Sequence, residues 1–253
     1  MNLIIDAGNS TVKLAIFNGR RIESYSRHEG WHPEAIGRLI QEFAIRNAIL
    51  SSVRDVPDEV YTLLVKPGCR LLELTTGIPL PLRIDYKTPA TLGKDRIAAA
   101  VGAWALYPHR NLMVVDAGTA LTMDLVNDQG IFEGGVISPG LMMRFKALNQ
   151  FTGRLPLVDP KDDPPLIGKS TTEAIQSGVL MGMIYEVDNY INSLKNKYNG
   201  LAVILTGGDA PRLTGKLKNT IFVEPNLVLN GLNCILSHNE LVTGSGIMKH
   251  EEI

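Results

Sequence analysis

The chain has 253 residues, of which 45% are apolar and 20% charged, and its formal net charge at pH 7 is −1. This length fits two domains of roughly 110 to 140 residues, and the near-zero net charge excludes the strongly basic surface of a nucleic-acid-binding or membrane-surface protein. Cys69 and Cys234 lie far apart without CxxC spacing, which favours a reducing compartment over a disulfide or zinc framework. Because Asp6 interrupts the apolar N-terminus and no uncharged run is long enough to span a bilayer, we expect a cytoplasmic protein without nucleic-acid or membrane partners.

The first third of the chain predicts a three-strand meander followed by alternating helices and strands. An apolar strand enters the turn Asp6-Ala7-Gly8-Asn9-Ser10, and Asn18-Gly19 reads as the next hairpin turn. Apolar residues at helical spacing after His32 predict a helix. The expected elements are strands at Thr11–Phe17, Arg21–Ser26, Ala48–Ser52 and Arg70–Leu74, with helices at His32–Arg46 and Pro57–Lys66. The predicted order is therefore βββαβαβ.

The segment Gly93-Lys94-Asp95-Arg96 comes directly before a run rich in alanine, which predicts a helix with Asp95 and Arg96 in its first turn. The dipole at a helix N-terminus favours a carboxylate there, and exposed N–H groups can meet an anionic ligand. The alternative is a capping aspartate followed by a solvated arginine. The residues alone leave both interpretations open.

The second half of the chain repeats the opening pattern. Strands are expected at 112–116, 120–126 and 131–137, with a turn at 127–130, followed by helices at about 140–149, 171–195 and 226–237 and strands at 201–205 and 220–223. The four prolines between Gly153 and Gly168 indicate a surface loop. We expect two domains, 1–110 and 111–253, each a mixed sheet with flanking helices.

The turn at Asp6 recurs 110 positions later as Asp116-Ala117-Gly118-Thr119. In the first copy, glycine lets the backbone approach a phosphate, hydroxyl and amide groups donate to it, and the Asp6 carboxylate can hold Mg²⁺ through water. Lys13 can add positive charge. The alternative is an ordinary hairpin with a solvated lysine, but recurrence with the same apolar lead-in favours a phosphate site.

A third glycine turn, Thr206-Gly207-Gly208, follows an apolar strand and could let an adenine or ribose lie against the backbone. The remaining motifs give weaker evidence of function. Gly168-Lys169-Ser170 is not a P-loop, because Asp163 stands where its first glycine belongs. His28 and His32 have helical spacing but no HExxH context, so a metal site there is not expected.

Five motifs in this order resemble type III pantothenate kinase, within the superfamily of acetate kinase, sugar kinases, Hsp70 and actin. The motifs are Asp6-Ala7-Gly8-Asn9-Ser10, Gly93-Lys94-Asp95-Arg96, Asp116-Ala117-Gly118-Thr119-Ala120, Gly134-Gly135-Val136-Ile137-Ser138-Pro139-Gly140 and Thr206-Gly207-Gly208. The resemblance implies two ribonuclease H-like lobes with ATP between them, a homodimer, and ATP-dependent phosphorylation of pantothenate to 4′-phosphopantothenate, the first step of coenzyme A biosynthesis.

The resemblance also implies residue roles. Asp95 would be the catalytic proton acceptor, Asp116 would bind a monovalent cation, K⁺ or NH₄⁺, and Asp6 would hold Mg²⁺ through water. The implied ATP contacts are Asp6, Ala7, Gly8, Asn9, Ser10, Thr11, Val12, Lys13, Thr119, Gly207 and Gly208. The implied pantothenate contacts are Tyr86, Gly93, Lys94, Asp95, Arg96 and Thr171, with Thr172 as an alternative to Thr171.

Two positions depart from the family pattern: Ser10 replaces a common threonine but keeps the hydroxyl, and Lys94 fills a variable position. We expect Lys94 to point to solvent rather than to add charge near the acceptor. Arg96 can pair with the carboxylate of pantothenate or with the transferring phosphoryl group.

Two other functions fit the same motifs. One is a kinase of the same superfamily that acts on another small hydroxyl or carboxyl acceptor. The other is a non-catalytic ATP-binding regulator, which the retained Asp6, Asp95 and Asp116, and the lack of a segment before residue 1 for a DNA-binding domain, argue against.

Overall fold

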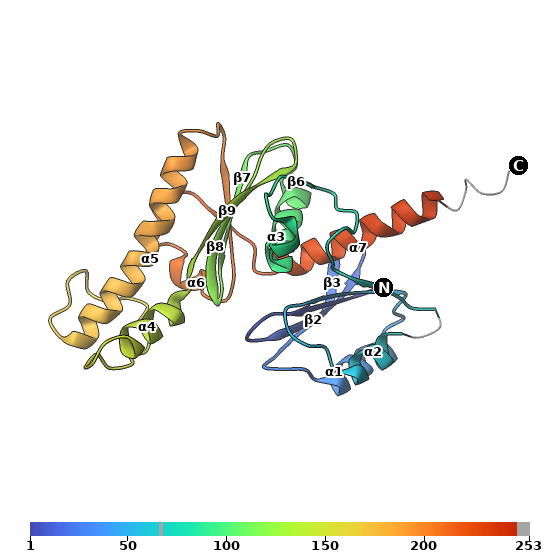
Figure 1. Ribbon diagram of the computed structural model, residues 1–253, viewed down its shortest axis with the longest axis horizontal. Coiled ribbons are helices and arrows are strands. Elements are labelled where there is room, and N and C mark those ends of the chain that lie inside the picture. The colour runs from blue at the N-terminus through green and yellow to red at the C-terminus, as the bar shows by residue number, and fades with distance from the viewer. Residues whose placement is uncertain (66–67, 247–253) are drawn as a thin grey trace, which may run out of the picture. The chain divides into compact units, whose positions relative to one another are not determined.

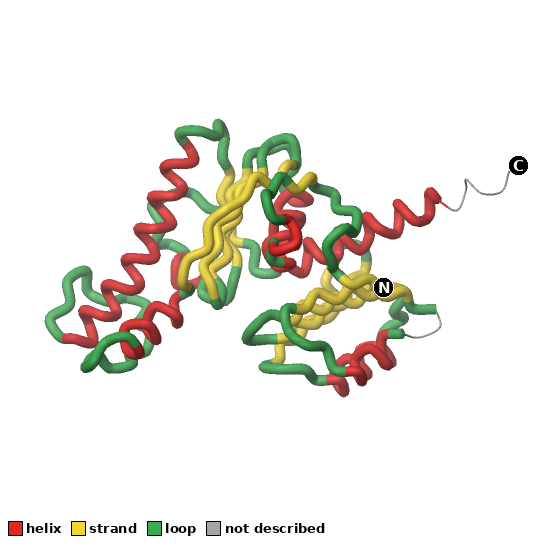
Figure 2. The backbone as a smooth tube through the Cα atoms, viewed as in Figure 1, coloured by secondary structure: helices red, strands yellow, loops and turns green. Residues whose placement is uncertain are grey.

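The computed structural model describes residues 1–65 and 68–246, with side chains described as far as residue 242 (Figure 1). The chain forms two compact units. Unit 1 contains residues 1–106 and the described part of the segment that begins at Asn226, and unit 2 contains Tyr107–Pro225. Each unit is built on a β-sheet with helices beside it (Figure 2).

Unit 1 opens with the predicted meander. Its strands are β1 (Asn2–Ala7), β2 (Val12–Asn18), β3 (Arg21–His28), β4 (Asn47–Ser52), β5 (Arg70–Glu73) and the short β6 (Arg83–Ile84). Its helices are α1 (Pro33–Glu42), α2 (Asp58–Leu64), a 3-10 turn (Pro89–Thr91), α3 (Lys94–Leu106) and α7 (Leu227–Gly246). The strand order is β3-β2-β1-β4-β5, with β1 antiparallel to β2 and parallel to β4. Alternate residues of β1 and β2 pack on α1 and α2 in one apolar core.

Unit 2 repeats this plan. Its strands are β7 (Leu112–Ala117), β8 (Ala120–Val126), β9 (Ile131–Pro139), β10 (Ala202–Thr206) and β11 (Phe222–Val223), and its helices are α4 (Leu141–Gln150), α5 (Thr171–Lys195) and α6 (Ala210–Leu213). Within the unit the strand order is β11-β10-β7-β8-β9. One apolar face of β7 and β8 packs against α5.

The two units therefore share one topology, in which β7 to β11 correspond to β1 to β5. In both, a three-strand antiparallel meander is extended by two parallel strands beside its first strand. This is the ribonuclease H-like arrangement, so the predicted fold class and the order βββαβαβ are confirmed.

Helix α7 completes unit 1 by crossing α3 at very short range. A Cβ atom on Gly231 would overlap the carbonyl oxygen of Ala98, and one on Gly102 would overlap the carbonyl oxygen of Leu227. Two glycines at the crossing let the backbones meet, and α7 also contacts β1 and β4. The compact units consequently differ from the predicted domains in the placement of α7. The domain boundaries 1–110 and 111–253, which follow the duplication in the sequence, stay a prediction.

Smaller differences concern element ends. Helix α1 stops at Glu42 instead of Arg46, because Phe43 is extended and the N–H of Arg46 already donates to the carbonyl of Met1 at the sheet. The predicted α2 end at Lys66 lies outside the described residues. Strand β6, the 3-10 turn and α6 were not predicted, and each is too short to show a periodic pattern. The segment 153–168 contains neither helix nor strand, as expected of a loop. Among the described helices, none is long and apolar enough to cross a membrane.

Candidate active site

The first predicted phosphate turn joins β1 to β2 in unit 1. The N–H of Gly8 donates to the carbonyl of Thr11 (3.0 Å), which closes the turn. Asp6 is buried, and Lys13, its cross-strand neighbour, places Nζ 3.4 Å from Asp6 Oδ2. Burial raises the pKa of Asp6, an effect that Lys13 opposes and the nearby Asp95 carboxylate reinforces. The turn therefore holds a desolvated carboxylate with one paired cation.

The predicted ATP contacts in this turn differ in what they can offer. The side chains of Ala7 and Val12 are each 1% exposed and belong to the core, so only their backbone can meet a ligand. Asn9 and Ser10 are exposed at the tip and can present side chains. A Cβ on Gly8 would make only an ordinary contact, 3.6 Å from the Thr11 carbonyl, so folding alone does not require glycine there.

A second segment beside this turn was missed by the sequence interpretation. Strand β4 is the parallel neighbour of β1, so Ser52 stands next to Ala7. Beyond it, Arg54 donates from Nη2 to the carbonyl oxygen of Asn9. The available signal was a cation just after a buried parallel strand, since the carboxyl ends of such strands meet at one edge of a sheet.

The segment Gly93-Lys94-Asp95-Arg96 leads into α3, as predicted. Asp95 is exposed in the first turn, and its Oδ1 accepts from the N–H of Arg96 (2.8 Å). Arg96 is only 6% exposed, so the alternative of a solvated arginine is excluded. Its guanidinium carbon lies 5.8 Å from the centroid of the Tyr86 ring, a cation–π contact that brings two predicted pantothenate contacts together. A Cβ on Gly93 would lie 2.5 Å from Asp95 Oδ1, so this position leaves room for the Asp95 carboxylate.

Lys94 does not point to solvent as expected. Its Nζ donates to the carbonyl oxygen of Ser52 (3.0 Å) at the end of β4. The long side chain satisfies the carbonyl of Ser52, the last residue of β4. Lys94 thus joins the start of α3 to the sheet edge that carries the first turn.

In unit 2, two predicted turns meet. Asp116 and Thr206 are register partners on β7 and β10. Gly207 has φ +98°, and a Cβ on it would overlap Asp116 Oδ1 and the carbonyl of Ala117. The N–H of Asp209 donates to that same carbonyl (2.9 Å). The carboxylate of Asp116 therefore lies against the third glycine turn.

Thr119 is exposed beside this cluster. A Cβ on Gly140 would overlap the carbonyl oxygen of Thr119, which explains why the motif ending in Gly140 packs directly on the second turn. Gly208 differs from Gly207, because a Cβ on it would meet nothing within 4 Å.

Thr171 is the first residue of α5. Ser170 caps the helix by accepting from the N–H of Glu173 (3.2 Å), and Glu173 Oε2 accepts from the N–H of Lys169 (2.8 Å). This is a capping arrangement, so the rejected P-loop segment has a structural role. Thr171 and Thr172 are both exposed, so the side chain of either one can meet a ligand.

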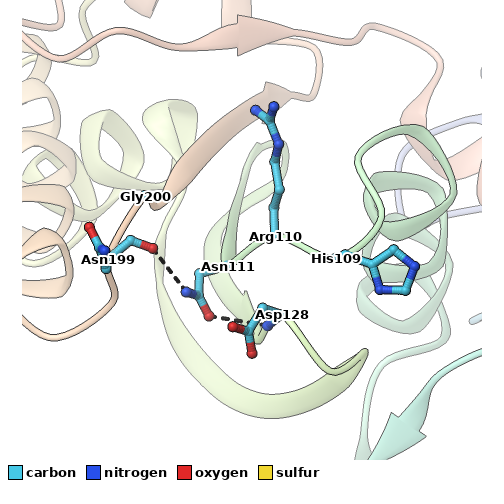
Figure 3. Close-up of a pocket in the computed structure, with 6 residues that line it drawn as sticks. All are labelled: His109, Arg110, Asn111, Asp128, Asn199 and Gly200. Atoms are coloured by element: carbon cyan, nitrogen blue, oxygen red, sulfur yellow. Dashed lines mark hydrogen bonds between the residues drawn. The ribbon is translucent and has the colours of Figure 1, made fainter.

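A polar pocket of about 360 Å³ lies elsewhere in unit 2 (Figure 3). Its residues precede β7 and β10 or belong to the β8–β9 turn, whereas the glycine turns follow β7 and β10, so the pocket is at the opposite edge of the sheet. Asn111 there accepts from the N–H of Asp128 and donates to the carbonyl of Asn199, linking three segments. Since the pocket contains none of the predicted residues, we assign its polar groups to structure.

The described residues contain no cluster of three His, Cys, Asp or Glu side chains for a protein-only metal cage. A single carboxylate fits Mg²⁺ nevertheless, because Mg²⁺ is commonly held by one or two carboxylates together with water and substrate phosphates. Asp6 supplies such a carboxylate in unit 1.

The family described as type III pantothenate kinase matches residues 2–193. A type III pantothenate kinase of Porphyromonas gingivalis is 48% identical over 243 residues, covering 94% of this chain and 98% of that protein. Those of Christiangramia forsetii and Phocaeicola vulgatus are 44% and 43% identical, each covering 95% of this chain and 99% of the relative.

Solved structures resemble the fold at lower identity. A protein from Campylobacter jejuni described as a Baf family transcriptional activator is 21% identical with a TM-score of 0.62, covering 94% of this chain and 99% of that one. The activator of 2-hydroxyisocaproyl-CoA dehydratase from Clostridium difficile, with bound ADPNP, is 10% identical with a TM-score of 0.51, covering 100% and 99%. These likenesses support the two-sheet α/β fold.

Proposed function

The chain belongs to the type III pantothenate kinase family, and from that premise we propose how its residues divide the reaction. It is a phosphotransferase that uses ATP to phosphorylate pantothenate in coenzyme A biosynthesis. Phosphoryl transfer has a loose transition state, so catalysis depends mainly on alignment and on neutralising charge over the phosphate oxygens. The observation that carries our assignment of roles is the edge of unit 1 where the Asp6 turn, Arg54 and the start of α3 meet.

Asp95 is our proposed catalytic base. It would accept the proton of the primary hydroxyl of pantothenate while that oxygen bonds to the γ-phosphorus and ADP leaves. Its exposure at the first turn of α3 suits contact with a substrate. Arg96 and Tyr86 would hold the acceptor, because the buried guanidinium stacked on the ring is a fixed cation for an anionic substrate group.

ATP would be held by the glycine turns. The backbone and hydroxyls of residues 8–11, together with Lys13, would bind the phosphates of ATP. Thr119 would contact the same phosphate chain. Gly207 and Gly208 would face the nucleoside. Mg²⁺ held by Asp6 through water would neutralise charge on the phosphate oxygens.

We also propose that Asp116 binds K⁺ or NH₄⁺. Its carboxylate lies against the backbone of Gly207 and within reach of Gly118, where backbone oxygens can complete a cation site. We expect that removing the Asp116 carboxylate abolishes the dependence of turnover on K⁺ or NH₄⁺.

The protein is further proposed to be a cytoplasmic homodimer. Support comes from large apolar side chains left exposed along α4, α5 and the loop between them, among them Phe151 at 80% and Ile167 at 78% exposure. A second copy of the chain would cover them.

A coupled assay of ADP formation tests the function directly. We expect turnover with pantothenate that rises when K⁺ or NH₄⁺ replaces Na⁺. ADP formation with another small hydroxyl or carboxyl acceptor, and none with pantothenate, would instead identify a different kinase of this superfamily. ATP binding without turnover on any acceptor would identify a regulator.

A further inference from the structure

The loop after β4 in unit 1 is held rigidly beside the first phosphate turn. Ser52 Oγ donates to the carbonyl of Arg54 (2.6 Å) and accepts from its N–H (3.2 Å). The N–H of Val53 donates to the carbonyl of Ala7 (3.0 Å). Three bonds thus fix the backbone around Arg54, and its side chain reaches across to the carbonyl oxygen of Asn9.

Arg54 makes no ion pair with a carboxylate among the described residues at this edge. Lys13 is paired with Asp6 at 3.4 Å, and Lys94 donates to the Ser52 carbonyl rather than into the turn. The carboxylate of Asp6 is thus neutralised in part by Lys13, whereas no described carboxylate neutralises Arg54. A triphosphate is a polyanion, so its binding here calls for a further positive group.

A guanidinium is the group best matched to that task. It presents five N–H donors in a planar fork, and the bond to Asn9 uses one nitrogen, Nη2. A cation that already touches the tip of the turn can donate from its other nitrogens to two oxygens of one phosphate. Anchoring of the loop by Ser52 lowers the conformational cost of that contact.

We propose that Arg54 is a phosphate-binding residue for the triphosphate of ATP, acting together with the backbone of Asn9. The proposal rests on the phosphate-binding role proposed above for residues 8–11. It assigns a function to a residue outside all five motifs.

The test compares Arg54→Lys, Arg54→Gln and Arg54→Glu in the full chain, with dissociation constants measured for ATP, ADP and AMP. We expect Arg54→Gln to weaken ATP binding about tenfold or more, as for loss of a charged hydrogen bond. Arg54→Lys should lose less and Arg54→Glu more, and the losses should shrink from ATP to AMP. Arg38→Gln, an exposed arginine on α1 of the same unit, is the matched control and should bind as wild type.

Thermal unfolding without nucleotide separates this role from a structural one. If Arg54 only stabilises the turn, Arg54→Gln and Arg54→Glu should weaken ATP binding equally and lower the unfolding temperature. That result would overturn the proposal. Unchanged ATP affinity in Arg54→Gln would overturn it too. Failure of the wild-type protein to bind ATP would instead reject the proposed role of the turn itself, and Arg54 with it.

Discussion

Asp95 and Asp6 are carboxylates of the same unit with opposite surroundings. Asp95 is exposed on the first turn of α3, while Asp6 is buried beside Lys13. Exposure suits a group that must meet a substrate hydroxyl, and burial suits one that holds a cation or organises water.

Asp95→Asn should lower turnover by about 10²-fold or more, because the amide cannot accept the hydroxyl proton. Affinity for ATP should stay near wild type, since the backbone of the turn is untouched. Steady-state kinetics with a separate nucleotide titration measure both. Asp58→Asn changes an exposed first-turn carboxylate on α2 and should leave turnover intact. Near-normal turnover in Asp95→Asn would remove its catalytic role.

Asp6→Asn should stabilise the protein at pH 7 while reducing Mg²⁺-dependent turnover. Burial raises the folded-state pKa of Asp6 above its ordinary value of 3.8, so the folded state favours the protonated carboxyl, and the ionised form subtracts stability. That penalty is complete above the folded-state pKa and vanishes as pH falls below the unfolded value. Urea unfolding in Mg²⁺-free buffer should show a gain of about 1 kcal/mol at pH 7, declining toward pH 4. A less stable variant at pH 7 would mean that pairing with Lys13 outweighs desolvation.

At the scale of elements, glycine spacing decides how closely backbones approach. Gly207 lets the turn after β10 press on Asp116, and Gly231 lets α7 cross α3, whose first turn contains Asp95 and Arg96. Other glycines in similar elements lie in open space. Substituting one crowded glycine and one glycine in open space therefore tests whether the close backbone approach requires glycine.

Gly207→Ala should cost about 1–3 kcal/mol, because alanine is strained at φ +98° and its Cβ would overlap Asp116. Gly208→Ala should stay within about 0.5 kcal/mol of wild type, since nothing lies within 4 Å of its added Cβ. Denaturant unfolding measures both. If Gly208→Ala nevertheless weakens ATP binding, the nucleoside lies against it. Equal stability of the two variants would contradict the geometry.

Gly231→Ala should destabilise the protein by about 1–3 kcal/mol, the usual cost of overpacking. Gly178→Ala, in the middle of α5 with open space around it, should instead gain up to about 1 kcal/mol from helix propensity. Thermal unfolding of both variants is the measurement. A neutral Gly231→Ala would show that α7 can move away from α3 at little cost.

For the whole molecule, the exposed apolar side chains of unit 2 predict self-association. Ile167→Asp should shift the chain from dimer to monomer, because a carboxylate buried in an apolar interface is strongly unfavourable. Light scattering after size exclusion measures the mass. Leu241→Asp, at an exposed apolar position on α7, is the control and should remain dimeric. A monomeric wild-type protein would contradict the proposal.

The amino-acid sequence by itself determined the duplicated plan and the chemical groups of the candidate site. Strand periodicity, the two Asp-Ala-Gly turns and the alanine-rich helix after Arg96 are local patterns, and local patterns report local backbone structure. They correctly placed the two meanders and the first turn of α3.

Only the tertiary structure decided which groups far apart in the sequence share an edge. Arg54 reached Asn9, and Lys94 reached Ser52, because β4 lies parallel beside β1. Helix α7 joined unit 1 because Gly102 and Gly231 permit its crossing with α3. Such contacts depend on sheet order and backbone approach, neither of which leaves a periodic signal in the chain.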